Sequence, residues 1–286
     1  MFGLEEDETL ILFLSAGLAL AGVVWHYLGQ LHALSFRRNP APGVIRVAVF
    51  VAMAWIAFVL WRYADPSVTG PYVFFYLVMG FAAVKVAGQG TAAKFGARTR
   101  VDVGERRNLA MAVLIGAFIV SSGLIFGGSL WGEADPAGDG EGGWWIPLGF
   151  FLLGWGCLAA LFALFLLRED EGFMARLRRE REMDDAVAAA FFLVSSAIIL
   201  TDAVAGDFWG WGHGLFTFGT LAGMLVAHEA FASLVRVPRA ASSGGLGGDA
   251  PASKDRVPWE WLVYLGLAAF AWGVNRWLDF VFGVRG

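Results

Sequence analysis

Apolar residues are gathered in eight runs along the chain, and polar segments separate these runs. An α-helix needs about 20 apolar residues to cross a bilayer, and every run reaches that length. The separators are unsuited to hydrocarbon, because they include Asp65-Pro66, the charge-rich residues 168–185 and the Gly-, Ser- and Ala-rich residues 240–253. The pattern predicts an all-α polytopic membrane helix bundle with about eight transmembrane helices. We expect these helices at residues 9–34, 44–64, 71–93, 107–130, 144–167, 186–206, 213–235 and 259–281.

Basic residues are distributed unevenly among the separators. Of the 21 Lys and Arg residues, 17 lie in the segments after the first, third, fifth and seventh runs. Loops rich in Lys and Arg stay in the cytoplasm, which is the positive-inside rule. We therefore expect these four segments to be cytoplasmic and both termini to lie on the outer, periplasmic side of a bacterial inner membrane.

The composition agrees with a membrane location and excludes several classes of protein. The chain is 58% hydrophobic and 16% charged, whereas soluble domains average about 45–50% and about 25%. A net charge of −4 gives no general basic surface for nucleic acid. The single cysteine, Cys157, permits neither an internal disulfide nor a metal site built from cysteines. Because nucleotide-binding and hydrolase motifs are also absent, we expect a non-enzymatic protein without catalytic residues, metal or cofactor.

Three two-helix hairpins resemble one another in sequence. Their first helices align so that Gly80, Gly156 and Gly223 share one position. The second helices of the first two hairpins share the similar segments 118–122 and 192–196. Parallel repeats occur in membrane transporters, although helices rich in Gly and Phe also resemble one another through composition alone. The alignment favours repetition most strongly for the helices at 144–167 and 213–235.

Three short motifs carry a resemblance to a known family. They are Glu-Arg-Arg-Asn at residues 105–108, Asp-Asp-Ala-Val-Ala-Ala-Ala at 184–190 and Gly-Asp-Phe-Trp at 206–209. On these motifs, residues 104–236 resemble domain of unknown function 350, the YjfL-type family of bacterial inner-membrane proteins. The resemblance implies a four-helix unit of two similar hairpins, set alongside envelope-stress proteins, and implies no catalytic residues. The chain departs from the family at Asp185, where Asn is usual, and at His228-Glu229, where an aromatic residue precedes Glu.

The runs and the motifs together divide the chain into four regions. We expect an N-terminal three-helix membrane region, a four-helix repeat domain, a flexible cytoplasmic linker and a C-terminal transmembrane helix. Their expected bounds are 1–103, 104–236, 237–257 and 258–286. The linker is expected to be flexible because Gly, Ser and Ala dominate it.

Ionisable residues inside the predicted helices are the candidates for a polar site in the membrane. The four candidates are Lys85, Asp202, His228 and Glu229. An ionised group at the centre of a membrane helix costs at least about 2.5–3.5 kcal/mol, so each is a candidate for function. One hypothesis is a proton or ion relay in which Lys85 pairs with Glu229. In the alternative, Lys85 extends its amine to the interface and Glu229 bonds to a neighbouring helix. Asp202 is in reach of Arg276 in either case.

The charged connector at residues 169–185 mixes basic and apolar side chains. The apolar residues Phe173, Met174 and Leu177 fall at near-helical spacing. The basic residues among them are Arg176, Arg178, Arg179 and Arg181. One interpretation is a surface helix that docks on anionic lipid headgroups or on a cytoplasmic protein partner. The other is a connector whose charges only fix the topology.

Three functions remain open on these grounds. The first is a membrane scaffold or partner in an envelope or stress process, embedded in the lipid bilayer as a homo-oligomer. The second is a channel or transporter for an ion or small solute, with the four intramembrane residues lining the path. The third is a haem-bearing redox protein that uses His26 and His228 as iron ligands, although no spacing motif supports it.

Overall fold

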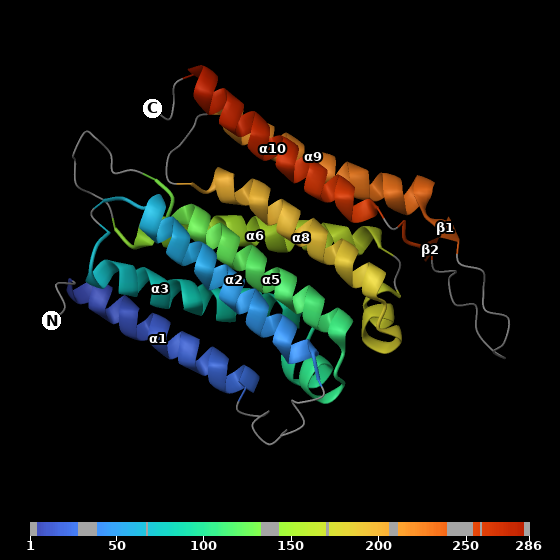
Figure 1. The fold of residues 1–286 in the computed structure, drawn as a ribbon, viewed down its shortest axis with the longest axis horizontal. Helices are drawn as coiled ribbons and strands as arrows, with labels where there is room; N and C mark the ends of the chain where they lie inside the picture. The colour runs from blue at the N-terminus through green and yellow to red at the C-terminus, as the bar shows by residue number, and fades with distance from the viewer. Residues whose placement is uncertain are drawn as a thin grey trace.

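The computed structural model describes residues 5–27, 39–66, 68–132, 143–169, 172–205, 211–238, 254–257 and 259–282. Over these residues the regular structure is helical, except for one antiparallel pairing of two-residue strands. The long helices lie side by side in one bundle (Figure 1). The all-α helix bundle predicted from the sequence is therefore confirmed.

Three hairpins follow two N-terminal helices, and short π-helical segments, labelled η, interrupt them. The N-terminal helices are α1 (Glu6–Tyr27) and α2 (Ala41–Arg62). The first hairpin comprises α3 (Pro71–Ala83), η3 (Val84–Gln89), α4 (Gly90–Lys94), η4 (Thr99–Glu105) and α5 (Leu109–Ser129). The second comprises α6 (Trp145–Arg168), α7 (Phe173–Ala175), η5 (Arg176–Glu180) and α8 (Met183–Ala203). The third comprises α9 (Trp211–Ala230), η6 (Phe231–Val235), β1 (Val237–Pro238), β2 (Lys254–Asp255) and α10 (Glu260–Phe282).

Seven helical stretches are long and apolar enough to cross a membrane. They correspond in order to the first seven predicted helices, from α1 to the stretch that α9 and η6 form. The chain is therefore consistent with a multi-pass membrane protein. Helix α10, the predicted eighth span, has 23 residues but carries Glu260, Arg276 and Asp279, and it is not among the seven.

The connectors of the three hairpins gather at one end of the bundle. In Figure 1 η4, α7 with η5, and the β1–β2 pair lie on the right, whereas α1 begins and α10 ends on the left. We call these two sides the connector end and the terminal end. At the connector end the side chain of Asn108 accepts a hydrogen bond from the backbone N–H of Met111 (3.1 Å) and so caps α5. Because the three connectors lie at the same end, their charged residues are gathered there as well.

Helix α5 forms the centre of the bundle and packs along both α2 and α8. Glycines permit the close approach: a Cβ atom at Gly123 would lie 2.9 Å from the Cα atom of Ala52, and one at Gly128 would lie 2.5 Å from the carbonyl oxygen of Thr201. Small residues let membrane helices pack backbone against backbone. Residues from α2 to α10 contribute to one hydrophobic core, so the N-terminal region and the hairpins pack as one unit.

Candidate functional site

Six charged side chains are buried together at the connector end. Charged side chains are almost never fully buried unless they are paired, and here three carboxylates face three guanidinium groups. The six residues are Glu169, Asp185, Glu260, Arg176, Arg236 and Arg256. We call them, together with the adjoining His228 and Tyr264, the ion network. They come from the ends of α6, η6 and β2, from η5 and from the first turns of α8 and α10.

Arg256 lies at the centre of the ion network. Its side chain is 3% exposed, and its three nitrogens reach three different carboxylates. Nη2 lies 2.5 Å from Glu169 Oε1, Nε lies 2.5 Å from Asp185 Oδ1, and Nη1 lies 2.7 Å from Glu260 Oε1. The planar fork of donors on arginine suits this arrangement better than a lysine amine would. One side chain thus joins α6, α8 and α10.

Arg236 and Arg176 complete the pairing. Arg236 places Nη1 2.9 Å from Glu169 Oε2 and Nη2 2.7 Å from Glu260 Oε1. Arg176 donates from Nε to Asp185 Oδ2 at 2.8 Å. Each of the three carboxylates therefore contacts two arginines, and the charges of the six residues balance.

Arg236 and Arg256 keep their charge in spite of burial. Burial has the largest influence on the pKa of Arg256 and acts to lower it, but the carboxylates of Glu169, Glu260 and Asp185 outweigh it and raise the pKa above its usual value. The pKa of Arg236 is also raised: burial and the neighbouring Arg256 oppose the rise, and Glu169 and Glu260 cause it. Both arginines therefore stay charged at any physiological pH.

His228 is enclosed beside the ion network and is fully buried. Its ring stacks on Phe165 with 4.1 Å between centroids, and its Nδ1 lies 2.9 Å from the hydroxyl of Tyr264. That hydroxyl donates its single hydrogen to Glu260 Oε1 at 2.7 Å, so Nδ1 is the donor to Tyr264. Among the residues that the structure describes, Nε2 has no hydrogen-bond partner, and it lies 3.5 Å from Glu169 Oε1. In the haem hypothesis the nitrogen that would bind iron is therefore Nε2, which faces Glu169 Oε1. The side chain of His26, the other ligand in that hypothesis, lies outside the described residues.

A metal ion fits this position poorly. Glu169, His228 and Glu260 offer ligand atoms that all lie within 4.8 Å of one another. The arginines already use these atoms: Arg256 donates to both glutamates, and Arg236, Arg256 and Tyr264 all converge on Glu260 Oε1 at 2.7 Å. A metal ion would have to displace guanidinium groups and add positive charge beside them. Glu169 and Glu260 are therefore better described as ion-pair partners of arginines than as metal ligands.

A second charge cluster, built around one buried carboxylate, ties the first two hairpins together. Asp102 of η4 accepts a hydrogen bond at Oδ2 from the backbone N–H of Arg98 (2.9 Å). Its Oδ1 pairs with Arg178 Nε at 3.3 Å and with Arg106 Nη1 at 3.4 Å. Gly96 adds to the link, because its carbonyl oxygen accepts a hydrogen bond from Arg178 Nη2. Segment η5 thus bridges two charge clusters, with Arg176 directed to one and Arg178 to the other.

The structure places the four predicted docking arginines differently from a surface helix. Arg176 is in the ion network, Arg178 pairs with Asp102, and Arg181 donates to the carbonyl oxygen of Arg106 at 2.9 Å. Arg179 and Arg181 are both exposed, and Arg179 has its side chain at the surface. The apolar partners Phe173 and Leu177 are buried in the protein core. Three of the four arginines therefore hold the connector in place.

The other predicted membrane residues do not meet in one site. The side chain of Glu229 is 47% exposed, and its Oε2 lies 3.5 Å from Arg168 Nε. It therefore pairs with Arg168, whereas the relay hypothesis pairs it with Lys85. Lys85 is buried in η3, with Nζ 5.6 Å from the centre of the Phe81 ring. The relay hypothesis needs these groups in a row, and their partners belong to different parts of the bundle.

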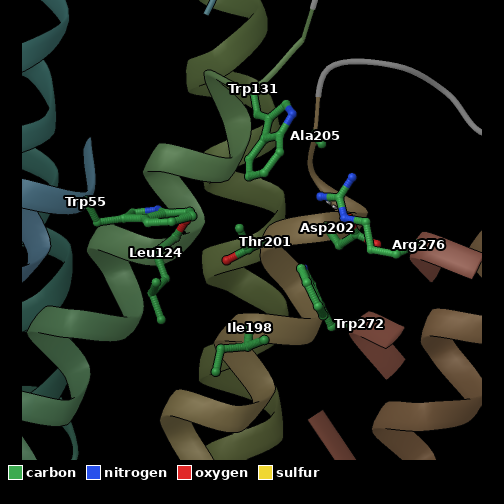
Figure 2. Close-up of a pocket in the computed structure, with 9 residues that line it drawn as sticks. All are labelled: Trp55, Leu124, Trp131, Ile198, Thr201, Asp202, Ala205, Trp272 and Arg276. Carbon is green, nitrogen blue, oxygen red and sulfur yellow. Dashed lines mark hydrogen bonds and ion pairs between the residues drawn. The ribbon is translucent and has the colours of Figure 1, made fainter. Parts of the chain in front are cut away.

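Asp202 is near the terminal end and pairs with Arg276, as the sequence predicts. Arg276 Nη2 lies 4.0 Å from Asp202 Oδ1, and Asn275 donates from Nδ2 to Asp202 Oδ2. Figure 2 shows this pair beside a cavity with three tryptophans around it. The position is far along α8 from Asp185 and the ion network, at the other end of that helix.

Most of the ion network is missed by sequence reasoning. Arg236 and Arg256 count there only as loop charges, and Glu169 only as part of a connector. Arg256 also falls in the expected flexible linker, yet it is buried, and Val237–Pro238 pairs with Lys254–Asp255 just before it. The Gly- and Ser-rich part of that linker, 240–253, lies outside the described residues. The sequence does offer one indication of the site. Arg256, Glu260 and Tyr264 follow one another at intervals of four residues around the start of a helix, a spacing that places side chains next to each other.

Comparisons with family models, with curated proteins and with solved structures give no match. The functional argument therefore rests on the geometry of these residues.

Proposed function

We propose that the chain is a non-enzymatic scaffold of the bacterial inner membrane that holds partners in an envelope or stress process. In this proposal α10 is an eighth transmembrane helix, the connector end is cytoplasmic and both termini are outside. The distribution of Lys and Arg supports the orientation. The resemblance of residues 104–236 to the YjfL-type family supports the setting and a repeated hairpin.

The observation that carries the proposal is the closure of the ion network. Three buried arginines match three buried carboxylates, and each carboxylate contacts two arginines. Charged groups along a transport path face a water-filled cavity instead. Here the buried charges pair with one another and link the ends of several helices, so the ion network acts as a clamp that makes the bundle rigid. This suits a protein that presents fixed surfaces to partners.

Two surfaces suit such partners. Among the described residues, no atom of another part of the chain lies within 4 Å of a Cβ atom added at Gly219 or Gly223 of α9, so this small-residue face suits a second membrane helix or a second copy. At the connector end Arg100, Arg168 and Arg179 keep exposed basic side chains. These side chains suit anionic lipid headgroups or an acidic cytoplasmic protein.

Proton transport is the second candidate, and one observation favours it. His228 Nε2 is buried without a hydrogen-bond partner, and Glu169 Oε1 lies 3.5 Å away. Nε2 faces that carboxylate, and on the other side of the ring Nδ1 contacts the Tyr264 hydroxyl, which donates to Glu260. Such a chain of titratable groups is what a proton relay requires.

A flux experiment separates the two functions. Purified protein is reconstituted into liposomes that contain a pH-sensitive dye, a pH gradient is imposed, and valinomycin with potassium balances the charge. The scaffold proposal predicts the same rate of pH change as in liposomes without protein. Flux that needs the protein, is lost in His228→Gln and persists in the matched surface variant Glu229→Gln would replace the scaffold with a proton relay.

A further inference from the structure

A cavity of about 170 Å³ lies between α2, α5, α8 and α10 near the terminal end of the bundle. Trp55, Trp131 and Trp272 line it together with Thr201, Asp202 and Arg276 (Figure 2). Its volume is several times the roughly 30 Å³ share of one water and below the roughly 300 Å³ at which drug-sized pockets begin. The cavity therefore suits a small polar group of a few non-hydrogen atoms.

A negatively charged and a positively charged side chain, Asp202 and Arg276, line this cavity. Asp202 is 8% exposed at its side chain, and its Oδ2 is held by Asn275. The facing Oδ1 lies 4.0 Å from Arg276 Nη2, which is longer than the 2.5–2.9 Å of the main pairs in the ion network. At this distance the two groups do not form a close hydrogen-bonded pair, and both line the cavity, so a ligand there meets a positive and a negative charge side by side.

Arg276 is held by aromatic rings and remains accessible. Its guanidinium carbon lies 5.1 Å from the centre of the Trp131 ring and 5.7 Å from that of Trp272, within the range of a cation–π contact. Its side chain is 29% exposed. A guanidinium held in this way can donate hydrogen bonds to a phosphate.

The surroundings indicate where such a phosphate comes from. Trp272 is 53% exposed and connects the cavity to the apolar outer surface of the bundle. Tryptophans and arginines near the end of a membrane helix lie at the level of the lipid headgroups. In one common class of phospholipid, the headgroup carries a phosphate and, beside it, a primary ammonium.

We propose that this cavity binds the headgroup of a phospholipid of the ethanolamine type, with its phosphate on Arg276 and its ammonium on Asp202 Oδ1. The acyl chains then lie along the outer surface next to Trp272. The proposal rests on the membrane location of the chain and not on its role as a scaffold, so it can fail while the scaffold proposal stands.

The test is lipid binding to the delipidated full chain in detergent, measured by native mass spectrometry. Wild-type protein is titrated with phosphatidylethanolamine, phosphatidylcholine and phosphatidylglycerol that carry the same acyl chains. We expect the ethanolamine lipid to bind about tenfold more tightly than the other two, because only it places a hydrogen-bonding ammonium on Asp202. Equal or tighter binding of phosphatidylglycerol would overturn the proposal, and so would free phosphoethanolamine binding as tightly as the lipid.

Variants locate the binding at the cavity. Asp202→Asn should remove the preference for the ethanolamine lipid, and Arg276→Gln should weaken the binding of that lipid by about tenfold. The matched control is Arg62→Gln, which removes an exposed arginine at the end of α2 and should leave binding unchanged. A control as damaging as Arg276→Gln would contradict the site. The wild-type lipid series decides the question even if a cavity variant does not fold.

Discussion

At the residue scale, Arg256 is the side chain whose loss should cost most. Arg256→Met leaves Glu169, Asp185 and Glu260 buried with fewer arginines than carboxylates. Removing one partner of a buried ion pair destabilises a protein by about 3–5 kcal/mol, because the remaining charge has lost its compensation. We expect a loss of that size in the free energy of unfolding, measured by reversible denaturation in mixed micelles.

The control for this variant is Arg179→Met, which removes an exposed arginine from the neighbouring segment η5. Exposed substitutions usually change stability by no more than about 0.5 kcal/mol. The double variant Arg256→Met with Asp185→Asn should recover part of the loss, since it removes one uncompensated carboxylate. Equal stability of the two single variants would show that the ion network is not a clamp.

The same residues show how far a sequence predicts a site. The pair of Asp202 with Arg276 is predictable, because both fall near the ends of runs that cross in opposite directions. The pair of Glu169 with Arg256 is not, because 87 positions separate the two residues and their meeting depends on the third hairpin folding back. A sequence predicts that a charged residue is buried only where apolar residues surround it along the chain, as they do Asp202 but not Glu169 or Arg256.

At the element scale, hydropathy predicts the helices closely and their ends less well. Helix α5 (Leu109–Ser129) lies within the predicted range 107–130, and α6 (Trp145–Arg168) is one residue from 144–167. The connector after α6 differs from the predicted surface helix, because Phe173 and Leu177 face the protein core. A periodic apolar face predicts that something covers it, but it does not indicate whether lipid or protein does so.

Helix α9 presents the element most suited to self-association. Gly219 and Gly223 form a Gly-x-x-x-Gly face that no other part of the described chain approaches, and such faces bring membrane helices together. Gly223→Leu should raise the dissociation constant between copies by about tenfold, which corresponds to roughly 1.4 kcal/mol. Energy transfer between donor- and acceptor-labelled copies in liposomes, followed as lipid is added, measures this constant.

The matched substitution is Gly149→Leu, because Gly149 of α6 is also free of neighbours within 4 Å. It adds the same side chain to a different helix, and we expect it to leave the association unchanged. Helical content by circular dichroism should stay the same in both variants. If Gly223→Leu associates as tightly as wild type, α9 is a face toward lipid and any assembly uses another surface.

At the scale of the whole molecule, the bundle has two chemically different ends. The ion network at the connector end contains ion pairs of 2.5–2.9 Å, whereas the Asp202–Arg276 pair at the terminal end is 4.0 Å long and lies beside a cavity. The ion network joins parts of the second and third hairpins, and Asp102 with Arg178 joins the first to the second. One end therefore stabilises the arrangement of helices, and the other contains the cavity for which a ligand is proposed.

The orientation of these ends in the membrane is the last expectation, and single cysteines test it. In a Cys157→Ala background, cysteine replaces one of four exposed residues: Arg179 and Trp259 at the connector end, or Thr69 and Val281 at the terminal end. The positive-inside rule predicts that a membrane-impermeant maleimide labels the terminal-end positions in intact spheroplasts and the connector-end positions only after permeabilisation. Trp259 and Val281 lie near the two ends of α10, so labelling from opposite sides requires α10 to cross the bilayer. Labelling of both from one side would leave seven crossings and place α10 on a single face.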